Sequence, residues 1–333
     1  MQAGKGYIFR STNSESRNTN TFLFPALQNA AKPRFFNGED VGVELAEYQA
    51  EYDFDRSWNF IGNPFPAFYD IRSMQTTAPI TVYEWNQGWW GSTLKYVAYS
   101  PQDDDYILNP GQGFFMQRPL EGGTVVFRKD GRQHNTEARS WEYYSVNASR
   151  ATAPRAKRQL FNLLLMKDGV QVDRARVVLN EDAALDYELS CDAAKFSSME
   201  PNATELYIVE GGQHMAIDER PLADGQVQLG LQLPSAGTYT ISFDTPSSEE
   251  VVLIDHAEGT QTTLAGGESY TFQAKAGTAE GRFTLRFGGA VDGISETMTG
   301  KSADDTWYDL QGRRVSQPQS GVYVRNGKKT IVK

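Results

Sequence analysis

Three tryptophans, Trp85, Trp89 and Trp90, are the residues of this chain best suited to binding chemistry, and they share the run EWNQGWWGSTLKY. The intervening polar residues Asn86 and Gln87, followed by glycine, predict the tip of a hairpin. A tryptophan at a hairpin tip usually either packs against the rest of the protein or binds a ligand. One interpretation is a platform that stacks on sugar rings, with Asn86 and Gln87 bonding hydroxyl groups. The alternative, that the indoles fold back as an end cap of the neighbouring sheet, is favoured by the usual burial of tryptophan.

Other reactive side chains do not form a recognisable catalytic or metal-binding pattern. The histidines, His134, His214 and His256, are scattered, and none has a paired-ligand spacing. His214 falls in a predicted hairpin, where a solvated turn residue is a simpler interpretation than a metal ligand or a general base. Cys191 is the only cysteine, so no intrachain disulfide forms, and the absence of a neighbouring histidine favours a packed thiol. We therefore predict no catalytic residue and no metal ligand.

Two acidic clusters offer oxygen ligands of the kind that calcium prefers. They are Asp103-Asp104-Asp105 and Asn180-Glu181-Asp182. Neither has the alternating spacing of a calcium loop, which favours solvated turns over a structural calcium site. Paired carboxylates for sugar hydrolysis are identified by their separation in space, so sequence alone does not assign them. We predict no cofactor, and we retain a cryptic β-sandwich hydrolase or lyase as an alternative.

Short β-prone runs bounded by Gly, Pro, Asn or Asp fill the chain, and no segment has a long helical period. The strands expected in the first part are residues 5–10, 21–24, 58–61, 80–85, 94–98, 113–117 and 124–127. Those expected in the second part are residues 159–166, 174–180, 206–210, 214–218, 227–233, 237–244, 250–255, 269–274 and 282–287. Residues 237–244 alternate strictly, which predicts one buried face formed by Tyr239, Ile241 and Phe243.

This spacing of strands predicts an all-β protein with two antiparallel β-sandwich domains of jelly-roll or immunoglobulin-like type and a short C-terminal β-hairpin tail. The expected limits are residues 1–148 for the first domain, 149–158 for a linker, 159–288 for the second domain, 289–306 for a flexible tether and 307–333 for the tail. The linker and the tether are small and polar, with little to bury.

Two local patterns in the first domain stand out. The run WNFIGNPFP at residues 58–66 consists of apolar and turn-forming residues, which favours a structural corner over a binding loop. The segments AGKGYIF at residues 3–9 and PGQGFFM at residues 110–116 both place Gly-x-Gly before an aromatic strand. This similarity is a hint of internal duplication.

Charge is distributed unevenly along the chain. The net charge is −10, so the chain lacks the excess of positive charge that is typical of proteins that bind nucleic acid or anionic lipid. Residues 301–333 contain seven basic residues against three aspartates, so this segment is +4 and residues 1–300 carry −14. No apolar run approaches the length of a membrane helix. The first residues lack the layout of a signal peptide, so export of this chain implies a longer parent with the signal upstream.

Residues 307–333 are predicted to form a separate unit of strands and turns. Asn326-Gly327 is a strong signal for a two-residue hairpin turn, because both residues accept the positive φ that this turn requires. The residues that define the tail motif are Tyr308, Asp309, Leu310, Gln311, Gly312, Arg313, Arg314, Gly321, Tyr323, Asn326, Gly327, Lys328 and Lys329.

Together, the runs WNFIGNPFPA, PGQGFF and YDLQGRRV…GVYVRNGKKTIVK resemble the C-terminal regions of large Bacteroidetes cell-surface proteins, and residues 173–196 are similar to the sandwich module before their tails. In that family, β-sandwich modules precede a sorting tail read by the type IX secretion system. The resemblance implies passage across the outer membrane through recognition of the tail, followed by its removal and by surface anchoring. It also implies a location at the cell surface or outside the cell.

The sequence therefore predicts a non-catalytic exported surface protein, with adhesin- or spacer-type modules and a C-terminal sorting signal. The expected partners are the secretion machinery, through the tail, and a glycan or surface partner, with no nucleic acid and no membrane span. The first alternative is a carbohydrate-binding accessory region of a larger glycan-degrading enzyme, for which Trp85, Asn86, Gln87, Trp89 and Trp90 are the candidate ligand-binding residues.

Overall fold

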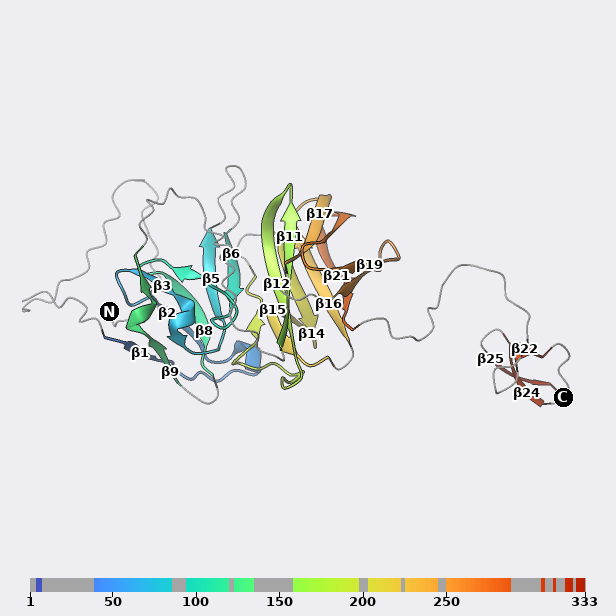
Figure 1. The fold of residues 1–333 in the computed structure, drawn as a ribbon, viewed down its shortest axis with the longest axis horizontal. Coiled ribbons are helices and arrows are strands. Elements are labelled where there is room, and N and C mark those ends of the chain that lie inside the picture. Colours follow the sequence, from blue (N-terminus) through green and yellow to red (C-terminus); the bar gives the residue numbers. More distant parts are fainter. Residues whose placement is uncertain are drawn as a thin grey trace, which may run out of the picture. The chain divides into compact units, whose positions relative to one another are not determined.

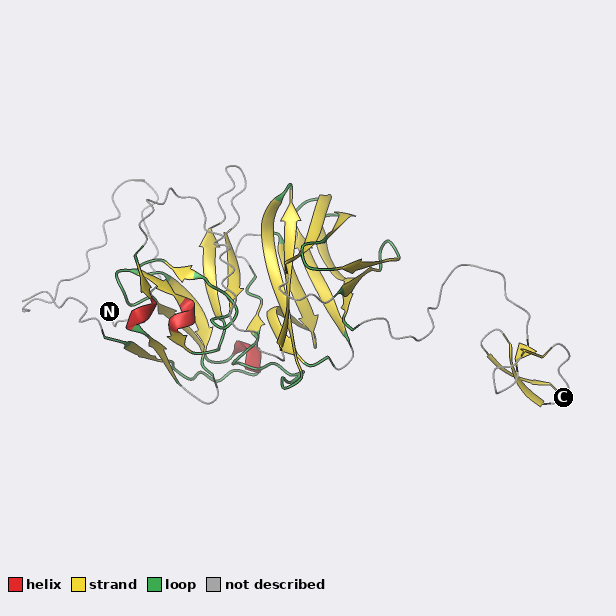
Figure 2. Ribbon diagram, in the orientation of Figure 1, coloured by secondary structure: helices red, strands yellow, loops and turns green. Residues whose placement is uncertain are grey.

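The computed structural model of this chain is all-β, as the sequence predicts (Figures 1 and 2). Within the described residues, the helical segments are 3₁₀ turns of three residues each, Asp53–Asp55, Ile71–Ser73 and Lys129–Gly131. The structure describes residues 4–7, 39–85, 94–119, 123–134, 158–197, 203–222, 225–244, 250–288, 307–308, 314–315, 321–325 and 328–332.

The chain divides into two compact units, Met1–Gly289 and Ala290–Lys333. The larger unit, called the body, contains two large hydrophobic cores that are separate from each other. We call its described residues up to 134 the first lobe and its described residues from 158 to 288 the second lobe. The smaller unit is called the tail unit.

Three antiparallel sheets surround the core of the first lobe. The largest, sheet A, has the strand order β2-β8-β5-β6, with the bounds Trp58–Gly62, Gly113–Gln117, Ile80–Trp85 and Leu94–Tyr99. The second has the order β1-β9-β4, with the bounds Val41–Glu44, Thr124–Phe127 and Met74–Gln75. The third has the order β10-β3-β7, with the bounds Arg132–Gln133, Phe68–Asp70 and Ile107–Leu108.

The run at residues 58–66 forms a structural corner of this lobe, as predicted. Asn63 is buried, and its amide nitrogen donates to the backbone carbonyls of Ala67 and Asn109 over 2.8 and 3.0 Å. Its side-chain oxygen accepts from the backbone N–H of Phe65. The Phe65 ring is 1% exposed and stacks on Tyr69, so the corner closes one end of the core.

A single eleven-stranded sheet builds the second lobe. Its path is β19-β18-β21-β16-β14-β15-β12-β11-β17-β20, and β13 (Ala193–Ala194) pairs with β15. The bounds along this path are Thr260–Leu264, Val251–Asp255, Gly277–Arg286, Gln226–Leu233, Glu205–Glu210, Gln213–Arg220, Val170–Asn180, Arg158–Lys167, Gly237–Asp244 and Ser269–Ala274.

Neighbouring strands of this sheet are antiparallel, except that β12 and β15 run parallel. The expectation of a purely antiparallel sheet is therefore wrong at this pair. The physical reason is that β14 comes between them along the chain and forms an antiparallel hairpin with β15, so that β15 runs in the direction of β12 and pairs beside it.

Side chains bring the two ends of the eleven-stranded sheet together. The Tyr270 hydroxyl on β20 donates to the Asp255 carboxylate on β18 over 3.1 Å and lies 3.2 Å from the Thr260 hydroxyl on β19. Arg282 on β21 pairs with the same aspartate and donates to the backbone carbonyl of Gln273 on β20 over 2.7 Å. The sheet is consequently nearly closed, like a barrel, around the larger apolar core.

Most predicted strands have nearly the predicted bounds, and β5, β8, β9, β17 and β20 match them at both ends. Tyr239, Ile241 and Phe243 on β17 are at most 1% exposed, which confirms the alternation. In the body, the strands that sequence did not predict are short or polar, namely β1, β3, β4, β7, β10, β13 and β19. In the predicted strand 5–10, Lys5 forms an isolated bridge to Ile61. Residues 8–10 and 21–24 lie outside the described part.

The tail unit is a four-stranded antiparallel sheet with the order β23-β22-β24-β25 and the bounds Arg314–Val315, Trp307–Tyr308, Gly321–Arg325 and Lys328–Val332. Arg325 pairs with Lys328, so a two-residue connection joins β24 to β25. This pairing confirms the predicted hairpin, and β22 and β23 extend it into a sheet. Asn326 and Gly327 themselves lie outside the described residues.

Candidate functional site

Sheet A carries aromatic side chains on the face that points away from the core of the first lobe. On β5, Val82 belongs to that core, whereas its neighbour Tyr83 lies on the opposite face and is 39% exposed. The strand register places Tyr83 opposite Tyr96 on β6, and Phe60 on β2 opposite Phe115 on β8. We call Phe60, Tyr83, Tyr96 and Phe115 the aromatic face.

The four rings of the aromatic face form a continuous row across the four strands of sheet A. Ring centroids lie 4.8 Å apart for Tyr83 and Tyr96, 6.1 Å for Tyr96 and Phe115, and 4.8 Å for Phe115 and Phe60. Phe60, Tyr96 and Phe115 are half-buried. Neighbouring rings are tilted by 53°, 67° and 43° in the same order, so the row is a ridged, uncharged and partly exposed surface.

Two glycines shape the position of Phe60 within this row. A Cβ atom at Gly113 would lie 2.4 Å from the tip of the Phe60 ring, and one at Gly6 would lie 2.3 Å from the Cδ1 atom on one side of the same ring. Gly6 also donates its backbone N–H to the Phe60 carbonyl over 3.0 Å. The two Gly-x-Gly segments thus flank the same strand, β2, from opposite sides, and the Phe60 ring occupies the space that their missing side chains leave.

Thr81 lies at the centre of the same face. It sits on β5 opposite Phe115 on one side and Ala98 on the other, and it is 2% exposed. Its hydroxyl oxygen has no hydrogen-bond partner among the described residues. An unpaired buried hydroxyl is costly, and Thr81 shares this condition with the Tyr69 hydroxyl and one Asp173 oxygen.

Residues near the lobe junction border the aromatic face. Phe196 of the second lobe packs edge-on against Trp58 with a centroid distance of 4.5 Å, and it lies 5.5 Å from Tyr96 and from Phe115. The Trp58 indole N–H donates to the backbone carbonyl of Phe54 over 2.8 Å. The second lobe therefore covers one side of the row, while Tyr83 remains at the open side.

Buried ion pairs hold the two lobes together next to this face. Asp104 follows β6 and accepts a bidentate pair of hydrogen bonds from Arg176 at 2.7 and 2.9 Å, with a further bond from Arg174. Burial disfavours the charged carboxyl, but the two guanidinium groups outweigh it and lower the pKa of Asp104 to about 2. Arg158 joins Asp103 of the first lobe to Glu219 of the second.

A second polar group fixes β6 against the second lobe. Burial raises the pKa of the Glu84 carboxyl on β5, which accepts a hydrogen bond from the Tyr99 hydroxyl. The Arg174 guanidinium lies over the Tyr99 ring at 4.5 Å from its centroid. Lys95 donates to the backbone carbonyl of Val172 in the second lobe over 3.1 Å, and burial lowers the pKa of its ammonium group.

The tryptophan residues predicted as ligand-binding lie next to the aromatic face along the chain. Trp85 is the last residue of β5, two positions after Tyr83, and it pairs with Leu94 at the start of β6. Asn86, Gln87, Trp89 and Trp90 lie outside the described residues, so the platform and the end cap both stay predictions. The half-buried aromatic row was not predicted, although β2, β5 and β8 carry apolar or aromatic residues at both odd and even positions, which is its sequence signal.

The structure corrects the interpretation of the first acidic cluster as a solvated turn. The side chains of Asp103 and Asp104 are only 8% and 10% exposed, because arginines of the second lobe pair with them. Those arginines follow far along the sequence, so no local pattern could have indicated the pairing. In the second cluster, Glu181 and Asp182 are exposed, as a solvated turn requires, and the Asn180 amide donates to Glu219.

His214 lies on β15 and not in a turn, so that part of its prediction is wrong. Its ring stacks on Tyr207 with a centroid distance of 4.0 Å, and its Nε2 lies 3.0 Å from the Glu280 carboxylate. Cys191 is half-buried and its thiol donates to Glu188, which agrees with a packed thiol. Burial and the nearby acids raise the pKa of the Cys191 thiol, which disfavours a nucleophilic thiolate.

Residues of the predicted tail motif fall partly on the strands of the tail unit. Tyr308 belongs to β22, Arg314 to β23, Gly321 and Tyr323 to β24, and Lys328 and Lys329 to β25. Asp309, Leu310, Gln311, Gly312, Arg313, Asn326 and Gly327 lie outside the described residues.

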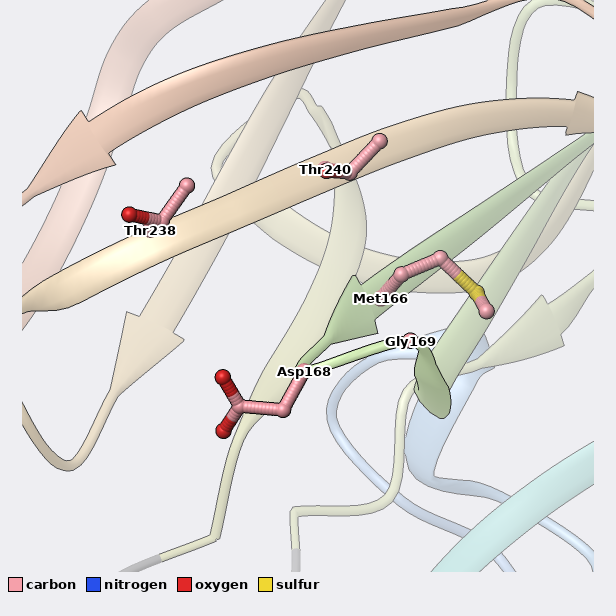
Figure 3. Close-up of a pocket in the computed structure, with 5 residues that line it drawn as sticks. All are labelled: Met166, Asp168, Gly169, Thr238 and Thr240. Carbon is pink, nitrogen blue, oxygen red and sulfur yellow. The ribbon is translucent and has the colours of Figure 1, made fainter.

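A hollow of about 340 Å³ lies on the second lobe, lined by Met166, Asp168, Gly169, Thr238 and Thr240 (Figure 3). The Asp168-Gly169 turn that joins β11 to β12 forms part of its wall. The Thr240 hydroxyl lies 3.0 Å from that of Thr271, and the Thr238 hydroxyl accepts from Gln273. The polar side-chain groups that line the hollow are therefore two partly engaged hydroxyls and one exposed carboxylate.

In the parts of the chain that the structure describes, no group of three or more His, Cys, Asp or Glu side chains is placed to hold a metal ion. No described helix is long and apolar enough to cross a membrane.

Comparison with known proteins yields one match. A family model described as a domain of unknown function, DUF8693, matches residues 1–287. Searches of curated proteins and of solved structures gave no match. The family match covers both lobes of the body and ends before the tail unit begins at Ala290.

Proposed function

This chain belongs to the DUF8693 family, whose description names no activity, and we propose that it is a non-catalytic exported surface protein. In this proposal the two lobes are sandwich-type domains that serve as an adhesin or spacer, and the tail unit is a sorting signal of the type IX kind. The observation that carries the proposal is that residues 290–333 form a compact unit of their own, which contains a four-stranded sheet.

The charge distribution supports the same proposal. Residues 301–333 are +4, whereas residues 1–300 carry −14, so the tail presents a chemically distinct surface to a receptor. The partner in this proposal is the secretion machinery, which reads the hairpin β24–β25 and the motif residues around it. The protein would then reside at the cell surface or outside the cell.

A reporter fusion tests this function directly. Residues 301–333 are fused to a fluorescent reporter that carries a periplasmic signal peptide and are expressed in a type IX-competent bacterium. The proposal predicts surface-exposed or released reporter that is lost when the secretion system is deleted. Retention in the periplasm, equal to that of the reporter without the tail, would show that the tail is not a sorting signal.

The aromatic face supports a second function, that of a carbohydrate-binding accessory region for a glycan-degrading enzyme. Exposed aromatic rings bind the apolar faces of sugar rings, and the row from Phe60 to Tyr83 consists of uncharged, partly exposed rings. The test is depletion of the full chain from solution by insoluble cellulose, xylan, mannan and chitin. Depletion by at least one polysaccharide is expected, and recovery of all the protein in every supernatant would contradict this function. The alternative of a hydrolase or lyase stays a prediction.

A further inference from the structure

We propose that Lys195 and Asp173 form an isopeptide bond, an amide between the lysine Nζ and the aspartate Cγ, which cross-links the second lobe within itself. Asp173 lies on β12, and Lys195 directly follows β13. The bond would therefore join β12 to the segment after β13. It involves neither the tail unit nor the aromatic face, so its formation is independent of both proposed functions.

The two side chains meet away from solvent. The Lys195 Nζ lies 2.5 Å from Oδ2 of Asp173, and the two side chains are 3% and 1% exposed. The Lys195 backbone N–H donates to the His214 carbonyl on β15 over 2.8 Å, which fixes the chain from which this lysine extends. Lys95 also interacts with Asp173 electrostatically, but its Nζ donates to the Val172 carbonyl over 3.1 Å. Lys195 is therefore the amine that contacts the carboxylate.

The hydrogen bonds around Asp173 fit an amide better than a carboxylate. Two donors, the Lys195 Nζ and the Leu206 backbone N–H at 2.7 Å, both approach Oδ2. The other oxygen, Oδ1, is buried and has no partner among the described residues. A carboxylate with an unpaired buried oxygen is costly. An isopeptide amide has a single oxygen, and the Leu206 N–H already pairs with it, so formation of the bond removes the unpaired acceptor.

The exclusion of water favours the same reaction. An ammonium and a carboxylate are costly to bury, and transfer of a proton from Nζ to the carboxylate gives a neutral amine and a neutral acid. The Nζ lone pair then attacks Cγ, and the Leu206 N–H stabilises the negative charge that develops on Oδ2.

The reaction balances without any further reactant. The new bond joins Nζ to Cγ, and the bond between Cγ and Oδ1 breaks. Nζ begins as an ammonium with three protons and keeps one of them as the amide N–H. The other two leave on Oδ1 as a water molecule. The product is neutral, as was the ion pair taken as a whole, and no oxidant or cofactor takes part.

Mass spectrometry of the intact, purified full chain under denaturing conditions tests the proposal. We expect a mass below that of the sequence by one water molecule. In a tryptic digest, residues 168–174 should be attached to the peptide that contains Lys195, with no cleavage after this lysine. A mass equal to that of the sequence would overturn the proposal, and so would a loss of water that maps to other residues.

Two lysine variants make the assignment specific. Lys195→Arg keeps a positive charge beside Asp173 but removes the amine, so its mass should equal that of its own sequence. Lys129→Arg is the matched control, because Lys129 pairs with Glu39 at 3.6 Å while the side chains are 52% and 65% exposed. It should lose one water molecule, as the wild type does. Loss of water that persists in Lys195→Arg would contradict the proposal. If that variant fails to fold, the mass of the wild type and its linked peptide still decide.

Discussion

Asp104 is held as a buried carboxylate by two arginines from a strand of the other lobe. Its local sequence, three consecutive aspartates, suggested a solvated turn, because nothing near it in the chain supplies a positive charge. The partners Arg174 and Arg176 become neighbours only when β12 packs beside the segment after β6. Residue pairings of this kind depend on tertiary structure and could not be predicted from the sequence.

The variant Asp104→Asn should destabilise the body by about 3–5 kcal/mol, because it leaves two buried guanidinium groups without their counter-charge. The measurement is urea unfolding at pH 7. Asp182→Asn, which removes an exposed carboxyl, is the control and should change stability little. Equal unfolding midpoints for the two variants would contradict the role given to Asp104.

The ion pairs of Asp104 with Arg174 and Arg176 also make the stability of the body sensitive to acid. The pKa of Asp104 is about 2 in the folded state, below the ordinary value of 3.8, so the unfolded chain binds its proton more readily. The stabilisation is present above about pH 4 and is lost as the pH falls towards 2. The measurement is the unfolding free energy of the wild type and of Asp104→Asn at each pH. The difference between the two proteins should shrink as the pH falls from about 4 to about 2.

Asp218 should show the opposite pH dependence. Burial raises its pKa to about 6, and Arg220 opposes this effect only in part. The folded state therefore binds the proton more tightly than the unfolded state, and stability should rise as the pH falls from 7 to 4, by up to about 3 kcal/mol from this group. Asp218→Asn should flatten this rise. The unfolding free energy of each protein is measured by urea unfolding between pH 4 and 7. If it depends on pH as steeply in Asp218→Asn as in the wild type, the assignment is refuted.

At the scale of elements, sequence predicted the strands well and their pairing poorly. Alternation on β17 gave the correct buried face, and Asn-Gly gave the correct hairpin, because both signals are local. The parallel pair β12–β15 and the near closure of the sheet depend on strands distant in sequence. The Gly-x-Gly similarity, interpreted as a hint of duplication, has a packing reason: both segments make room for one phenylalanine ring.

Gly113→Ala tests that packing reason. The new Cβ would lie 2.4 Å from the Phe60 ring, so the ring must move, at a cost of about 1–3 kcal/mol. Gly42→Ala is the matched control, since it also lies in a strand and its Cβ would meet only Thr124 at 3.6 Å. Chemical denaturation should separate the two variants. Equal stability would show that Phe60 does not depend on the glycine at position 113.

At the scale of the molecule, the body and the tail unit are distinct. Buried ion pairs join the lobes of the body, and the family match spans both of them. The tail unit lies beyond that match and has a sheet of its own. Sequence indicated this division from the reversal of charge and the polar tether, both of which are visible without tertiary structure.

The most direct test of the central claim, that the tail unit exports the body, is protease accessibility in a type IX-competent bacterium. The full chain and a chain that ends at Gly289 are each expressed behind a periplasmic signal peptide, and intact cells are treated with protease. The proposal predicts that the full chain is digested at the surface or found in the medium, whereas the shortened chain stays protected in the periplasm. Equal surface exposure of the two chains, or equal protection, would contradict it.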